Sequence, residues 1–156
     1  MGFFKKRILL YAPMAGKILP LAEIPDPAFS GRMLGRGIAI VPSDGRVYAP
    51  CDGTVETVFP TGHALTLQAP WGGEILIHVG LDTVTLTGQG FLLRVAAGET
   101  VKRGQLLLEA DLDAIRRAGL DPVTPVVLCN WQKFNGFRVL PPKEVTAEEP
   151  IMELRL

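Results

Sequence analysis

Gly72-Gly73-Glu74-Ile75-Leu76-Ile77-His78-Val79-Gly80 is a short, mainly apolar run with glycine at both ends. β-Branched and other apolar residues favour a strand, and the flanking glycines favour turns. Similar short runs lie at residues 37–41 and 64–68, and 17 glycines and 13 prolines divide the chain. The pattern predicts a mostly β fold, in which many short strands are joined by tight turns.

Three turn motifs narrow the architecture. Ala12-Pro13-Met14-Ala15-Gly16-Lys17-Ile18 and Ala49-Pro50-Cys51-Asp52-Gly53-Thr54-Val55 share the pattern Ala-Pro-x-x-Gly-x-apolar, which is typical of a strand that enters a turn. Gly98-Glu99-Thr100-Val101-Lys102-Arg103-Gly104-Gln105-Leu106 resembles a turn of biotinyl and lipoyl domains and of other barrel-sandwich proteins. We therefore expect a compact β-barrel or sandwich of the barrel-sandwich hybrid type.

One segment has the pattern of a helix. Residues 112–118 follow Asp111, a good N-cap, and precede Gly119, a helix-stopping residue. The segment is long enough for about two turns. We therefore expect one or two very short helices in a fold made mostly of strands.

Length and composition indicate a single domain. The 156 residues, 47% hydrophobic and 21% charged, suit one compact core. We expect residues 1–11 to be an N-terminal tail and residues 12–156 to be the domain. The tail is basic and then apolar, and it is too short to span a bilayer. It is either a frayed terminus that leads into a strand or, at most, a weak membrane contact.

Charge and cysteine content exclude several function classes. The 16 basic residues balance the 16 acidic ones, so no global field favours nucleic acid. Cys51 and Cys129 form no CxxC pair and follow no convincing signal peptide, which argues against a disulfide scaffold or a thiolate zinc site. The reducing cytoplasm is the expected location.

The two histidines of the chain lie in similar β-rich surroundings. On a regular strand, Leu76, His78 and Gly80 share one face, while Ile75, Ile77 and Val79 share the other. Because Gly80 has no side chain, a phosphoryl group or a partner's backbone can approach His78 closely. A histidine among apolar residues can equally be a satisfied core residue, and the residues alone leave both interpretations open.

A family resemblance favours the functional interpretation. Residues 72–84 resemble the active-site signature of glucose-type IIA proteins of the bacterial phosphoenolpyruvate-dependent sugar phosphotransferase system. That signature has a Gly, two variable positions, three apolar residues, the phosphorylated His, and then apolar-Gly-apolar-x-Thr-Val. The resemblance runs in order from Ala12 to Trp131, through residues 24–29, 33–40, 49–55, 59–64 and 123–127.

The resemblance implies a phosphotransferase component that needs no cofactor. It implies that His78 accepts a phosphoryl group from phospho-HPr and passes it to a IIB domain of a sugar permease. By the same resemblance His63 stabilises the phosphoryl group, Thr61 orients His63, the Gly80 carbonyl accepts a hydrogen bond from His78 Nδ1, and Asp82 belongs to the surrounding polar shell.

The chemistry of imidazole agrees with these roles. An unperturbed pKa of about 6.5 leaves much of a histidine neutral at cytoplasmic pH, with one lone pair for attack on phosphorus. Because a phosphoryl group brings roughly two negative charges, a second imidazole that donates to its oxygens stabilises the product. Donor and acceptor would both be proteins, so an apolar rim is expected. Our candidates for the docking surface are Phe29, Met33, Leu34 and Val84, although each can instead pack in the core.

Other functions stay open. A regulatory module that signals by its phosphorylation state would need the same residues and would bind regulatory protein targets. A biotinyl or lipoyl carrier needs a modified lysine at a hairpin tip, a setting that neither Lys17 nor Lys102 has. A β-rich zinc peptidase lacks an obvious third ligand. Zinc bound by His63 and His78 together with a partner's carboxylate remains possible.

Overall fold

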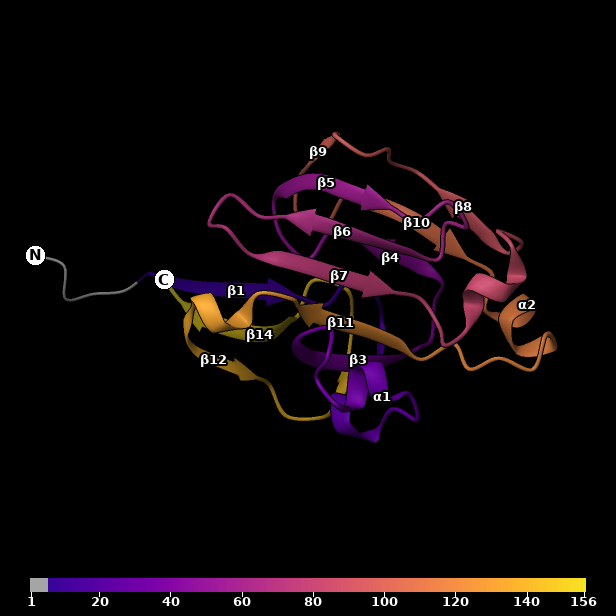
Figure 1. Ribbon diagram of the computed structural model, residues 1–156, viewed down its shortest axis with the longest axis horizontal. Coiled ribbons are helices and arrows are strands. Elements are labelled where there is room, and N and C mark those ends of the chain that lie inside the picture. Colours follow the sequence, from indigo (N-terminus) through magenta and orange to yellow (C-terminus); the bar gives the residue numbers. More distant parts are fainter. Residues whose placement is uncertain (1–5) are drawn as a thin grey trace, which may run out of the picture.

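The computed structural model describes residues 6–156 and shows a fold built mostly from strands (Figure 1). The strands are β1 (Arg7–Tyr11), β2 (Gly16–Pro20), β3 (Arg36–Pro42), β4 (Arg46–Tyr48), β5 (Gly53–Val58), β6 (Ala64–Gln68), β7 (Glu74–His78), β8 (Phe91–Leu93), β9 (Thr100–Val101), β10 (Leu106–Ala110), β11 (Thr124–Leu128), β12 (Asn135–Val139), β13 (Glu144–Val145) and β14 (Pro150–Arg155). The helices are α1 (Pro27–Ser30) and α2 (Leu112–Arg117), with short 3-10 turns η1 (Leu21–Glu23), η2 (Thr83–Leu86) and η3 (Trp131–Lys133).

Three sheets enclose the core. The main sheet has the order β13-β2-β3-β11-β7-β6-β5-β9, and the two smaller sheets have the orders β1-β14-β12 and β4-β10-β8. Every strand pairing is antiparallel. The expected mostly β fold is confirmed. Within residues 6–156 the strand order of each sheet is linear, so no sheet closes into a barrel.

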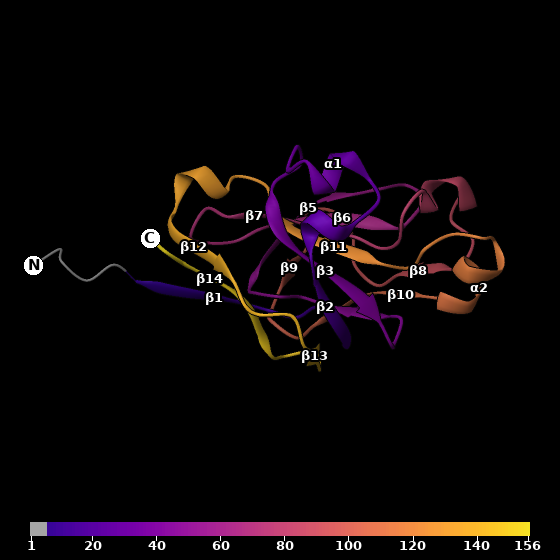
Figure 2. The same ribbon diagram turned by 90° about the horizontal axis from the view of Figure 1, so that it is seen from below.

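Strand β7 is buried on both faces, with the side-chain alternation that its sequence predicts. Ile75 and Ile77, together with Val79 just beyond the strand, belong to the main hydrophobic core. Leu76 points to the other face and joins a second cluster with Phe29. Figure 2 shows α1 lying over β3 and β11, where it covers this second cluster. The end of β7 is therefore held between a large core and a short helix.

The two short helices are stabilised by aspartate caps. At α2, Asp111 accepts a hydrogen bond from the Ala114 N–H at 3.0 Å, and Gly119 follows with φ of 78°, so the predicted helix is confirmed. At α1, the Asp26 side chain accepts from the Ala28 N–H at 3.0 Å. No helix among the described residues has the length and apolar character needed to cross a membrane.

More of the N-terminal segment belongs to the fold than the sequence indicates. Residues 7–11 of the expected tail form β1, which pairs with β14 near the C-terminus, for example Arg7 opposite Arg155. Because β14 lies far from β1 in the sequence, no local sequence pattern predicts this pairing. The expected membrane contact through residues 1–11 rests partly on residues 1–5, which lie outside the described part of the chain.

Candidate functional site

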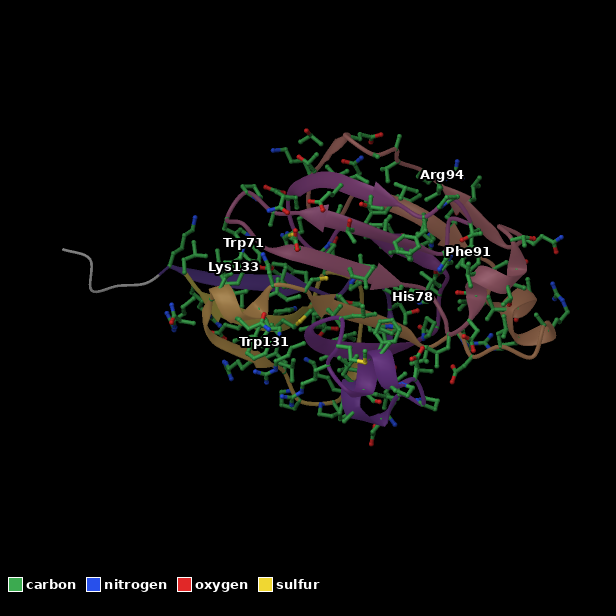
Figure 3. All side chains as sticks on the ribbon, viewed as in Figure 1. Trp71, His78, Phe91, Arg94, Trp131 and Lys133 are labelled. Atoms are coloured by element: carbon green, nitrogen blue, oxygen red, sulfur yellow. The ribbon has the colours of Figure 1, made fainter. Side chains whose placement is uncertain are left out.

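Strand pairing brings the two histidines together. In the antiparallel register of β6 and β7, Ala64 lies opposite His78, which places His63 beside His78. The Val79 N–H donates to the His63 carbonyl at 2.8 Å. The two ring centroids are 4.8 Å apart and the ring planes meet at 81°. In Figure 3, the His78 side chain lies at the end of β7 nearest to α1.

The Nδ1 atom of each histidine has a hydrogen-bond partner two residues away. His78 Nδ1 lies 2.8 Å from the Gly80 carbonyl oxygen, and His63 Nδ1 lies 2.5 Å from Thr61 Oγ1. A carbonyl only accepts, so the neutral His78 ring carries its proton on Nδ1 and keeps the lone pair on Nε2. The Thr61 hydroxyl can donate, in which case His63 carries its proton on Nε2. The pair thus offers one nucleophilic nitrogen and one N–H donor.

Burial keeps both rings neutral. His63 is only 2% exposed, and burial, helped by the nearby His78, lowers its pKa to about 4. The pKa of half-buried His78 is also lowered, chiefly by burial. The hydrogen bond to Gly80 and the negative charges of Asp26 and Asp82 oppose that shift. At neutral pH both imidazoles are therefore uncharged, which preserves the lone pair of His78.

Aromatic rings surround the pair. The Phe29 ring centroid lies 5.3 Å from that of His78, and the Phe59 and Phe91 centroids lie 5.4 and 6.3 Å from that of His63. Phe29 is 3% exposed, so its expected place on a docking surface is wrong: α1 turns the ring inward against His78. Phe59 and Phe91 were missed because an aromatic residue beside a turn gives no sign of what it will contact.

The other predicted rim residues lie at the surface. Met33, Leu34 and Val84 are 77%, 41% and 52% exposed. Asp82 has the left-handed φ of 58° and precedes η2, from where its charge reaches His78. Asp26 was missed, although an aspartate before Pro27 is the usual start of a helix and predicts α1.

The rival sites find little support among residues 6–156. No cluster of three or more His, Cys, Asp or Glu side chains in this part of the chain is suited to a metal ion, so a zinc peptidase has no ligand set here. Zinc on the histidine pair would need a ligand from another molecule. Lys17 lies within β2 and not at a hairpin tip, so it is not placed as the modified lysine of a carrier.

Comparison with known proteins points to one family. Residues 8–134 match the model of a family described as "phosphoenolpyruvate-dependent sugar phosphotransferase system, EIIA 1". The glucose-specific EIIA component of Oceanobacillus iheyensis is 42% identical over 144 residues, which cover 92% of this chain and 87% of that protein. The structure titled glucose permease IIA from Mycoplasma capricolum superposes with a TM-score of 0.89 at 36% identity, covering 98% of this chain and 99% of the other.

Two further relatives are much longer than this chain. The glucose-specific EIICBA component of Staphylococcus saprophyticus is 43% identical over 145 residues, and the β-glucoside-specific EIIBCA component of Dickeya chrysanthemi is 44% identical over 145 residues. The match covers 93% of this chain in both cases but only 21% and 23% of these relatives. The present chain thus corresponds to one part of each.

Proposed function

The chain belongs to the EIIA 1 family of the phosphoenolpyruvate-dependent sugar phosphotransferase system, and we propose that it carries the phosphoryl group on Nε2 of His78. The observation that supports this site is the hydrogen bond of His78 Nδ1 to the Gly80 carbonyl, 2.8 Å long, beside a second imidazole. The bond leaves Nε2 as the nitrogen with a lone pair. The family is one of phosphoryl carriers, and His78 is the residue of this chain best suited to that task.

The transfer needs only alignment and charge stabilisation from the protein. The Nε2 lone pair of His78 forms the new bond to phosphorus while the bond between phosphorus and the donor protein breaks. His63, with its proton on Nε2, donates to a phosphoryl oxygen, and the Thr61 hydroxyl donates to His63 Nδ1. The proton of His78 stays on Nδ1 throughout, hydrogen-bonded to the Gly80 carbonyl. Transfer to the acceptor reverses these steps.

The partners follow from the family and from the surface. We assign phospho-HPr as the donor and a IIB domain as the acceptor, because relatives named EIICBA and EIIBCA carry the matching segment within one polypeptide. Exposed Met33, Leu34 and Val84 provide apolar surface for both proteins. The exchange takes place in the cytoplasm. The transported sugar is glucose or a β-glucoside, the two sugars for which the relatives are named.

Phosphoryl transfer between purified proteins tests the proposal. The wild type, His78→Ala and His63→Gln are each mixed with phosphoenolpyruvate, enzyme I and HPr, and the intact mass is followed over time. We expect one phosphoryl group on the wild type and on His63→Gln, and none on His78→Ala. A purified IIB domain added afterwards should remove the group quickly from the wild type and slowly from His63→Gln. Equal labelling of wild type and His78→Ala contradicts the assignment.

A further inference from the structure

The turn that carries the Gly80 carbonyl, residues 79–83, contains a buried hydroxyl with a defined partner. Thr83, the first residue of η2, is fully buried. Its Oγ1 donates a hydrogen bond to the Val79 carbonyl at 2.6 Å. A buried polar side chain is costly unless its hydrogen bond is made, so this bond selects one conformation of the turn.

Gly80 is held closely from two sides within this turn. Its φ is 78°, and a Cβ atom built on it would lie 2.5 Å from Thr83 Cγ2 and 3.1 Å from the Asp121 carbonyl oxygen. That carbonyl also accepts the Leu81 N–H at 2.9 Å. The Thr83 methyl group therefore packs against Gly80 on one side, and the segment before β11 holds the turn on the other.

We propose that Thr83 is a positioning residue that sets the tautomer of His78. The inference rests on the proposed role of His78 as the phosphoryl acceptor, and it concerns how the nitrogen that attacks is selected. The Thr83 hydroxyl fixes the Val79 carbonyl, and through the adjoining peptide groups it keeps the Gly80 carbonyl opposite His78 Nδ1.

Loss of the Thr83 hydroxyl alone should change the conformation of the turn. The Val79 carbonyl is then a buried acceptor without its donor, and rotation of the adjoining peptide groups relieves that loss by exposing it to water. The same rotation moves the Gly80 carbonyl away from His78 Nδ1. The proton of His78 is then free to occupy Nε2, and a ring protonated there has no lone pair with which to attack phosphorus.

Isosteric substitution separates this role from a merely structural one. Thr83→Val removes the hydroxyl and keeps the volume, and Thr83→Ser keeps the hydroxyl. Thr85→Val is the matched control, because the Thr85 hydroxyl also donates to a carbonyl of this region, that of Asp82 at 2.7 Å, but at the surface. The side-chain ¹⁵N shifts of His78 in the full chain, recorded at a pH where the ring is neutral, report which nitrogen carries the proton.

We expect the wild type, Thr83→Ser and Thr85→Val to show His78 protonated at Nδ1. Thr83→Val should show a clear population protonated at Nε2 and about tenfold slower phosphoryl uptake, a loss comparable to that seen when a residue that orients a metal-ligating histidine is removed. An unchanged His78 tautomer in folded Thr83→Val overturns the proposal. If Thr83→Val does not fold, Thr83→Ser decides: a loss of the Nδ1-protonated form there shows that the hydroxyl is not the controlling group.

The tautomer measurement needs no partner protein. Failure of the proposed function would appear as a wild-type chain that takes up no phosphoryl group from phospho-HPr. Failure of the present inference would appear as a wild-type tautomer in Thr83→Val, whatever the uptake. The two results are therefore distinguishable in the same set of samples.

Discussion

The imidazole rings of His63 and His78 meet edge to face, with centroids 4.8 Å apart, in a setting that disfavours a positive charge on either ring. Two neighbouring imidazolium ions would repel each other, and burial would remove the water that stabilises each. The pair is consequently a neutral unit at physiological pH. Protonation of these rings in acid should therefore destabilise the fold.

Acid should destabilise the fold through His63. Its pKa is about 4 in the folded protein and 6.5 in an unperturbed chain, so between these values the unfolded chain binds the extra proton. The stabilisation is complete above pH 6.5 and is lost as pH falls toward 4, by about 3 kcal/mol at 1.4 kcal/mol per pKa unit. Urea unfolding at several pH values measures this loss. His63→Gln should show a correspondingly smaller fall in the free energy of unfolding over this range, and an identical fall would refute the assignment.

Phosphorylation should reverse the shift at His63. A phosphoryl group on His78 places about two negative charges next to the His63 ring, and an adjacent negative charge favours the protonated form. We expect the pKa of His63 to rise from about 4 toward its ordinary value in the phosphorylated protein. NMR titration of the His63 ring signals before and after phosphorylation measures the change. A pKa that stays the same would mean that the phosphoryl group does not reach His63.

Local patterns predicted the strands and the histidine face, while long-range packing decided the rest. Alternation in residues 75–79 indicated that Ile77 and His78 point to opposite sides, because that property belongs to one strand. The burial of Phe29 was not predictable in this way. It depends on α1 lying over β3 and β11, whose neighbours come from other parts of the chain. The pairing of β1 with β14 was missed for the same reason.

Truncation of Phe29 should lower the stability of the fold, whereas truncation of Met33 should leave it nearly unchanged. Phe29 is 3% exposed and packs against His78, so Phe29→Ala should leave a cavity and lower the free energy of unfolding by about 3–5 kcal/mol. Met33 is 77% exposed, so Met33→Ala should change it by less than about 0.5 kcal/mol. If Met33 docks a partner, its truncation should weaken binding of HPr by about fivefold, or ~1 kcal/mol. Urea unfolding and calorimetric titration with HPr measure the two effects.

The β1–β14–β12 sheet should depend on one carboxylate. Glu153 on β14 is 6% exposed, and its side chain bonds Arg7 at 3.0 Å and Arg138 at 2.7 Å, which ties both neighbouring strands to β14. Glu153→Gln leaves these guanidinium groups without their counter-charge and should lower the urea midpoint. Glu109, which pairs with Arg94 at the surface, gives the control. Exposed pairs contribute little, so Glu109→Gln should have a clearly smaller effect. Equal urea midpoints for the two variants would show that the Glu153 carboxylate contributes no more to stability than the exposed Glu109 carboxylate.

Gly80 and Gly119 offer a matched pair that separates backbone strain from crowding. Both have φ of 78°, so alanine at either position pays the cost of the left-handed conformation, about 1–2 kcal/mol. A Cβ at Gly119 meets nothing within 4 Å, whereas one at Gly80 would lie 2.5 Å from Thr83 Cγ2. Gly80→Ala should therefore cost about 1–3 kcal/mol more than Gly119→Ala, the usual penalty of overpacking. It should also displace the carbonyl that His78 Nδ1 needs and slow phosphoryl uptake, while Gly119→Ala keeps the wild-type rate. Equal unfolding free energies and equal uptake rates for the two variants would show that the Gly80 turn is not closely packed and does not orient His78.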